Sequence, residues 1–149
     1  MESSSSFPRL FTVEEANALL PVLRPLVEGI LDKIRRLKAK SAVVIRDHQI
    51  DPEAPDLMNR LHENPEIAAL IKEIKRGVDE IEGQGCMCKG LEQGLLDFPC
   101  QLGKEIVFLC WQYGEAGVNY WHRVEDGFAG RRPLLDPEQN EPGGNMSYH

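Results

Sequence analysis

The sequence has no uninterrupted run of about 18 apolar residues, the length that a membrane span requires. Its first residues, MESSSSFPRLF, lack a basic region followed by an apolar stretch, so they do not have the pattern of an export signal. Basic residues are also few: 17 Lys and Arg stand against 24 Asp and Glu, which gives a net charge of -7. Because an acidic surface repels phosphates, a general nucleic-acid binder is excluded. We therefore expect a cytoplasmic protein without membrane or nucleic-acid partners.

Cysteines are scarce, with four in 149 residues, and without an export signal we expect reduced thiols rather than disulfides. Cys86 and Cys88 lack the two-residue spacer of a zinc knuckle, and Cys110 lies in an apolar run where a thiol behaves as a small hydrophobe. The cysteines thus give only a weak metal signal. The length and the 42% hydrophobic content fit one domain. We place it at residues 11–134, between a flexible N-terminal tail at 1–10 and a polar C-terminal tail at 135–149.

The first helix is predicted to begin after Thr12, because Thr12 and Glu15 form a capping box. Pro21 and Pro25 follow, and each costs about 3 kcal/mol inside a helix. The pattern therefore predicts a short helix at 13–20 and a second at 25–47, with one kinked helix as the alternative. A third helix is expected at 64–82, where Asn64 and Pro65 are typical of a helix start and Gly83 or Gly85 of its end.

The two long helices each carry one apolar stripe, and neither stripe can be buried by its own helix. We therefore expect an antiparallel helical hairpin. Basic residues also gather on the first long helix. They are Lys33, Arg35, Arg36, Lys38 and Lys40. We interpret this group as a solvated face paired with acids of the neighbouring helix, in preference to a surface for an acidic partner or RNA.

After Gly85 the pattern changes to β-branched and aromatic runs separated by glycines, which is typical of short antiparallel strands. We predict strands at 86–91, 94–99, 105–113 and 118–124. The unbroken apolar run from Ile106 to Trp111 indicates a strand covered on both faces. The predicted class is α+β: a long antiparallel helical hairpin packed on a small antiparallel β-meander.

Residues 114–125 allow two interpretations. As a hairpin, residues 114–117 form a four-residue turn, which pairs Trp111 with Tyr120, Cys110 with Trp121 and Leu109 with His122. As a helix, Glu115, Asn119, His122 and Asp126 share one polar face that could hold a divalent metal or an acid–base pair. The glycines at 114 and 117 favour the hairpin.

Candidate site residues lie between positions 97 and 131. The catalytic candidates are His122, Glu115 and Asp97, and the metal candidates are His122, Glu115 and Glu125. The ligand-binding candidates are Trp111, Tyr120, Trp121 and Arg131. Asp97, flanked by Leu96 and Phe98, needs a partner, for which Arg131 or Arg123 is suitable. For His122 and Asp97 a structural role is the favoured alternative, and for Arg131 a salt bridge in a surface loop.

Several segments together resemble a known family. They are FTVEEANALLP at 11–21, GC at 85–86, GLLDFP at 94–99, LCWQYGE at 109–115 and YWHRVEDGFAGRRP at 120–133. With these segments the chain resembles the uncharacterised prokaryotic domain-of-unknown-function family 2203. The resemblance covers nearly the whole chain apart from its two ends, and it implies membership but no reaction. Its signature positions here would be Asp97, Cys110, Trp111, Gly114, Glu115, Trp121, His122, Gly127 and Arg131.

Two functional hypotheses follow. The first is a non-enzymatic binding or assembly module that forms a homo-oligomer through its helical hairpin, since a domain of this size exposes any stripe that its sheet does not cover. The second is a metal-assisted or acid–base enzyme acting on a small polar substrate at residues 97–131. The first is favoured, so neither a cofactor nor a divalent metal is our first expectation, although a small-molecule ligand fits both hypotheses.

Overall fold

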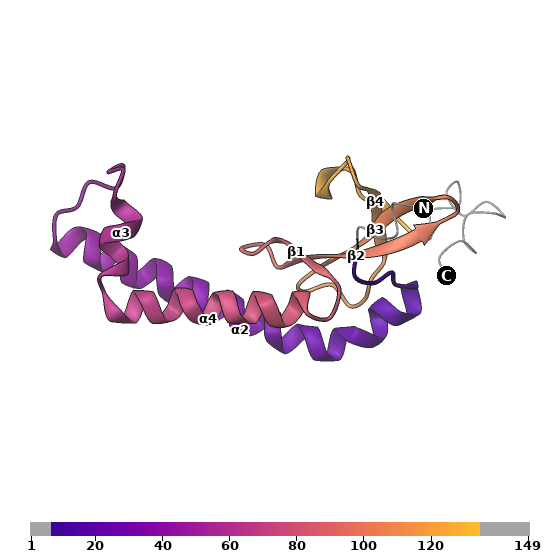
Figure 1. The fold of residues 1–149 in the computed structure, drawn as a ribbon, viewed down its shortest axis with the longest axis horizontal. Coiled ribbons are helices and arrows are strands. Elements are labelled where there is room, and N and C mark those ends of the chain that lie inside the picture. Colours follow the sequence, from indigo (N-terminus) through magenta and orange to yellow (C-terminus); the bar gives the residue numbers. More distant parts are fainter. Residues whose placement is uncertain (1–6, 135–149) are drawn as a thin grey trace.

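The computed structural model describes residues 7–134 and has the predicted α+β class. Two long helices, α2 (Val13–Asp47) and α4 (Pro65–Glu82), form an antiparallel hairpin, and a five-stranded antiparallel sheet packs on one end of it. The hairpin extends well beyond the sheet and carries the short helix α3 (Leu57–His62) at its far end (Figure 1). Within the described residues, no helix is long and apolar enough to cross a membrane.

Helix α2 is one continuous helix, so the predicted break between 13–20 and 25–47 is wrong and the kinked alternative is correct. Thr12 and Glu15 form the expected capping box, with both hydrogen bonds at 3.0 Å. Pro21 and Pro25 are exposed on the outer side of the helix, while Leu20 and Leu23 on the inner side are buried. Water can therefore satisfy the carbonyls that the prolines leave free, and core packing holds the helix together around its bend.

Helix α4 begins where Asn64 accepts hydrogen bonds from the backbone of Glu66 and Ile67, and it ends at Gly83. It buries Ile67, Ile74 and Ile81. At the far end of the hairpin a second small core lies under α3, a helix that the sequence did not predict. This core consists of Val44, Ile50, Leu61 and Ile67.

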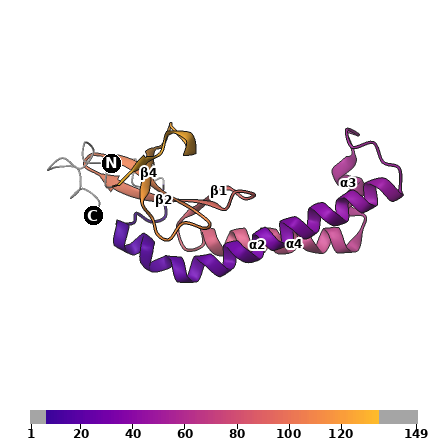
Figure 2. The ribbon, with the colours of Figure 1, turned by 180° about the vertical axis from the view of Figure 1, so that it is seen from behind.

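The sheet has the strand order β1-β2-β3-β4-β5. The strands are β1 (Met87–Gly90), β2 (Leu95–Leu102), β3 (Glu105–Gln112), β4 (Tyr120–Arg123) and β5 (Arg132–Pro133). The predicted meander is therefore present, but the 3-10 helix η1 (Phe128–Gly130) and the strand β5 were not predicted. Both views show the connection between β1 and β2 reaching along the hairpin toward α3 (Figures 1 and 2).

Strand β2 continues to Leu102, three residues beyond the predicted end at Pro99. The carbonyl of Pro99 accepts a 2.7 Å hydrogen bond from the backbone of Phe11, which lies on the side away from β3. The N atom and the carbonyl of one residue point to the same side of an antiparallel strand. The missing N–H of Pro99 therefore faces away from the β3 ladder and costs it no hydrogen bond.

The two faces of the sheet are covered differently. Leu96, Phe98, Leu109, Trp111 and Trp121 face the helices in the main core. The other face carries Asp97, Cys110 and His122, which the register brings together. All residues from Ile106 to Trp111 are buried, so this strand is covered on both faces as expected.

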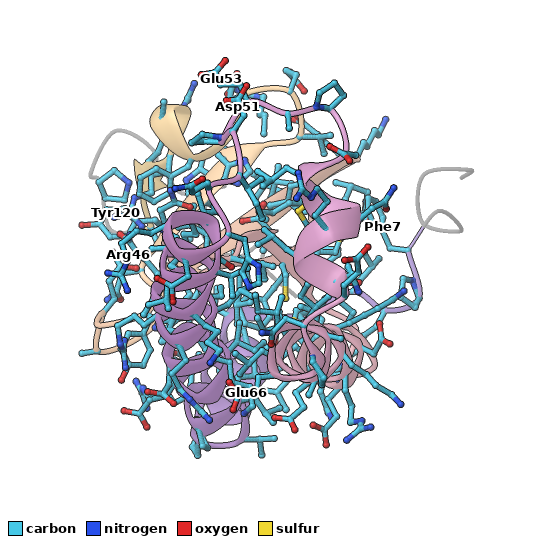
Figure 3. All side chains as sticks on the ribbon, turned by 90° about the vertical axis from the view of Figure 1, so that its left-hand side faces the viewer. Phe7, Arg46, Asp51, Glu53, Glu66 and Tyr120 are labelled. Atoms are coloured by element: carbon cyan, nitrogen blue, oxygen red, sulfur yellow. The ribbon has the colours of Figure 1, made fainter. Side chains whose placement is uncertain are left out.

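The second face is partly covered by the N-terminal segment. The ring of Phe7 packs edge-on against Phe108 at 5.7 Å, and Arg9 lies over Phe11 and donates to the carbonyl of Gln84. The prediction of a flexible tail at 1–10 is therefore wrong for residues 7–10. In the view along the hairpin, Phe7 and Tyr120 lie on opposite sides of the molecule (Figure 3). The tail predicted at 135–149 lies outside the described residues.

Candidate functional site

The connection between β3 and β4 decides between the two interpretations of residues 114–125. The chain forms the hairpin, so the helical face of Glu115, Asn119, His122 and Asp126 does not exist. The pairs are Cys110 with Tyr120, Leu109 with Trp121 and Phe108 with His122. Each pair differs by one residue from the predicted register. Because side chains alternate between faces, this shift sets His122 beside Phe108 rather than Leu109, on the face that also carries Cys110.

The register differs because the connection is longer than a four-residue turn. Val118 is buried, and its backbone N–H donates to the side chain of Asn17 at 2.8 Å. The indole of Trp111 donates to the carbonyl of Glu115 at 3.0 Å. These contacts fix residues 113–119 against α2, so β4 begins only at Tyr120.

Asp97 and His122 form a buried pair in the middle of the second sheet face. His122 Nε2 lies 3.1 Å from both carboxylate oxygens of Asp97, and the two residues are only 3% and 2% exposed. His122 Nδ1 lies 2.8 Å from the carbonyl of Arg123, which can only accept, so Nδ1 carries a proton. Both ring nitrogens thus face acceptors, which favours an imidazolium paired with the Asp97 carboxylate.

The environment of His122 supports this charge state. Burial by itself lowers the pKa of His122, but hydrogen bonds to Asp97, Cys110 and the Arg123 carbonyl, with the negative charge of Asp97, raise it from 6.5 to about 10. Lys89 also lies 3.7 Å from Asp97 and 4.4 Å from the centre of the Phe108 ring. The partner of Asp97 is therefore His122, with Lys89 at the rim, and not Arg131 or Arg123 as predicted.

Cys110 lies beside this pair. It is opposite Asp97 across the β2–β3 ladder and is 1% exposed. One donor atom from each of Asp97, Cys110 and His122 lies within 4.8 Å of the other two. In the described part of the chain, these three side chains form the cluster of possible metal ligands. The predicted metal set of His122, Glu115 and Glu125 is not assembled: Glu115 pairs with Arg131, and Glu125 is exposed.

Glu115 and Arg131 form a second pair beside the first. Arg131 donates to the two carboxylate oxygens of Glu115 at 2.7 and 3.3 Å, and Glu115 also accepts the backbone N–H of Gln112. The guanidinium of Arg131 lies over the rings of Tyr120 and Phe128. Burial lowers the pKa of Arg131, but hydrogen bonds to Glu115 and Cys110 raise it overall. Cys110 therefore lies close to both ion pairs.

The aromatic candidates are mainly structural. Trp111 is fully buried and Trp121 is 3% exposed, and both belong to the main core. Tyr120 is only partly buried and packs under Arg131. Lys89 and Cys110, the latter expected only as a signature position of the family, were not among the site candidates from the sequence. The alternation of side chains along β3 could have placed Cys110 with Phe108 on the second face, whereas Lys89 had no signal of its own.

Comparison with known proteins agrees with the resemblance seen in the sequence. The family model described as Uncharacterized conserved protein (DUF2203) matches residues 9–134. No curated protein and no solved structure matches the chain. The matched range contains the whole hairpin, the whole sheet and both ion pairs. The chain therefore belongs to the DUF2203 family of uncharacterized conserved proteins.

Proposed function

We propose that this chain is a cytoplasmic, non-enzymatic binding module that self-associates through its helical hairpin. The single observation that supports the proposal most is an apolar trough beside the projecting part of the hairpin. The trough has a volume of about 530 Å³ and lies between α2, Ile74 of α4 and the connection between β1 and β2. This connection reaches along the hairpin where α2 and α4 extend beyond the sheet (Figures 1 and 2). All four cysteines are free thiols, which is consistent with a reducing compartment.

The lining of the trough is mainly aliphatic, with Lys38, Ser41 and Glu92 as its polar members. Ile34, Leu37, Ala42 and Ile45 come from α2, and Leu91 comes from the connection between β1 and β2. Leu91 is 37% exposed although it is a large apolar residue. Apolar patches of this kind on a small domain commonly mark interaction sites, because covering them removes apolar surface from water.

The charges around the trough favour a second copy of this chain as the occupant. Lys38 and Glu92, which both line the trough, form a 2.7 Å ion pair at its edge. A two-fold symmetric interface presents the same patch from both copies, so charges can pair across it only where that patch carries both signs. The pair of Lys38 and Glu92 supplies both signs. Elsewhere on the hairpin, Lys40 pairs with Glu66 at 2.6 Å, so two members of the basic group on α2 are engaged by acids, which supports the expectation of no nucleic-acid partner.

Light scattering on the purified full chain tests the proposal. We expect a homodimer at roughly tens of micromolar, the range of a moderate interface. Ala42→Glu places a charge in the trough at an exposed helix position and should give a monomer. Val22→Glu is the matched control, because Val22 is 49% exposed on the same helix and outside the trough, and it should leave the dimer intact. A wild-type monomer, or equal effects of the two substitutions, would contradict the proposal.

An enzyme acting on a small polar substrate at residues 97–131 is the second candidate. The buried pair of Asp97 and His122, with its raised pKa, is the observation in its favour. Each of the three residues Asp97, Cys110 and His122 is at most 3% exposed. A substrate could therefore reach them only if the side chains packed over them moved away. The binding module ranks first for this reason.

A further inference from the structure

We infer that Asp97, Cys110 and His122 form a binding site for one divalent transition-metal ion of the zinc class. The three residues come from the adjacent strands β2, β3 and β4, and their donor atoms converge on one point of the second sheet face. The inference does not depend on self-association, because this face of the sheet lies apart from the trough on the hairpin.

The distances suit a small rearrangement into a metal site. The carboxylate oxygens of Asp97 lie 3.1 Å from His122 Nε2, and all three donors lie within 4.8 Å of one another. Zinc binds histidine nitrogen and carboxylate oxygen at about 2.0 Å and cysteine sulfur at about 2.3 Å. Donors this close need only side-chain movements to reach a common ion, and mixed sulfur, nitrogen and oxygen ligands suit zinc-like metals.

The orientation of His122 favours a metal over a proton relay. Its Nδ1–H is donated to the Arg123 carbonyl, which is the usual arrangement behind a metal-binding histidine and directs Nε2 toward the ion. In a nucleophilic relay, one ring nitrogen faces the thiol and the other faces the carboxylate. In this chain Nδ1 is hydrogen-bonded to the Arg123 carbonyl. Nε2 is therefore the ring nitrogen that is left to interact with both Asp97 and Cys110. Asp97 and Cys110 thus both lie on the Nε2 side of the His122 ring, as expected for three ligands of one metal ion.

The charges balance when an ion is bound. A divalent ion replaces the proton on His122 Nε2 and the proton of the Cys110 thiol, so two protons leave and the ion meets two negative ligands and one neutral ligand. The buried site then has no net charge, which its low exposure favours. Arg131 is already neutralised by Glu115, and Lys89, whose side chain is 41% exposed, can turn from Asp97 to solvent.

Cobalt titration of the full chain, purified without chelators or a histidine tag, tests this inference. We expect a thiolate-to-cobalt charge-transfer band that saturates at one equivalent of Co²⁺ and disappears when Zn²⁺ is added. Cys110→Ser should abolish the band, and Asp97→Asn should weaken cobalt binding tenfold or more. Cys100→Ser is the matched control, because Cys100 is equally buried in β2 but faces the helices, so the band should persist.

Two outcomes would overturn the inference: wild-type protein without a band saturating at one equivalent, or a band retained in Cys110→Ser. If Cys110→Ser fails to fold, X-ray absorption of the zinc-loaded wild-type chain decides instead. One sulfur at about 2.3 Å with nitrogen and oxygen neighbours supports the site. No sulfur, or two sulfurs as expected from Cys86 with Cys88, overturns it.

Discussion

Nε2 of His122 lies at the same distance, 3.1 Å, from both carboxylate oxygens of Asp97, so the histidine holds the whole carboxylate rather than one of its oxygens. The two residues stand on strands that are not neighbours, with β3 between them. This pair is the buried polar centre of the second sheet face, with Lys89 and the pair of Glu115 and Arg131 near it, and several measurable consequences follow from it.

Asp97→Asn should destabilise the fold strongly, because it leaves a histidine buried without its counter-charge. Breaking one partner of a buried ion pair costs about 3 to 5 kcal/mol. Urea unfolding of the metal-free chain measures the loss. Arg123→Gln is the control, since it breaks the partly exposed pair with Glu105 and should cost about 1 kcal/mol or less. Equal costs for the two variants would contradict the buried ion pair.

The stabilisation from His122 should depend on pH in one direction. Its pKa is about 10 in the folded chain against 6.5 for an ordinary histidine, so the folded state holds the proton more tightly. The contribution is therefore complete below pH 6.5 and is lost as the pH rises toward 10. The difference in unfolding free energy between wild type and His122→Gln should shrink over this range. A difference that grows with pH would show that the histidine is buried neutral.

Arg131→Lys should destabilise the chain by about 1 to 3 kcal/mol, because lysine cannot make the two-pronged bond to Glu115 or stack equally on Tyr120. Urea midpoints measure the effect. Arg46→Lys is the same substitution in an exposed pair with Asp47, and it should change the midpoint little. Similar shifts in both variants would mean that the Arg131 geometry contributes nothing specific.

The thiols of β1, β2 and the segment before β1 should react slowly in the native chain. Burial raises the pKa of Cys86 and Cys100 to about 12, and burial together with the charge of Glu82 raises that of Cys88 to about 11. Cys88 is also only half-buried. Alkylation followed by peptide mass spectrometry should label Cys88 before Cys86 and Cys100. In urea the three should react alike, and a native rate for Cys100 equal to that of Cys88 would refute the burial argument.

The sequence predicted the long helices and the main strands better than the pairing register of the strands. The Thr12 capping box and the Asn64 cap are local signals, and they correctly predicted where α2 and α4 begin, while the apolar spacing correctly predicted helix over residues 25–47 and 65–82. The continuity of α2 through Pro21 and Pro25 depends on packing against a sheet that lies more than 60 residues further along the chain. The free-energy cost of proline inside a helix favoured a break in α2, but packing of the helix in the main core outweighs that cost.

Four of the candidate residues lie near one another in the structure, but their partners were not predicted. Asp97, Glu115, His122 and Arg131 form two ion pairs, and Cys110 lies close to both. The pairing depended on a shift of one residue between β3 and β4. That shift comes from Val118 and Asn17, which are 101 residues apart, so no local signal could reveal it.

The continuity of α2 also determines how the two hydrophobic clusters relate. Leu37, in the C-terminal half of α2, packs against both the main core and the small core under α3. The helix that carries it is about 52 Å long, given a rise of 1.5 Å per residue over 35 residues. A loop at Pro21 and Pro25 would have placed a flexible hinge between the two parts of this helix. A bent but unbroken helix instead joins the small core under α3 to the main core through one continuous hydrogen-bonded backbone.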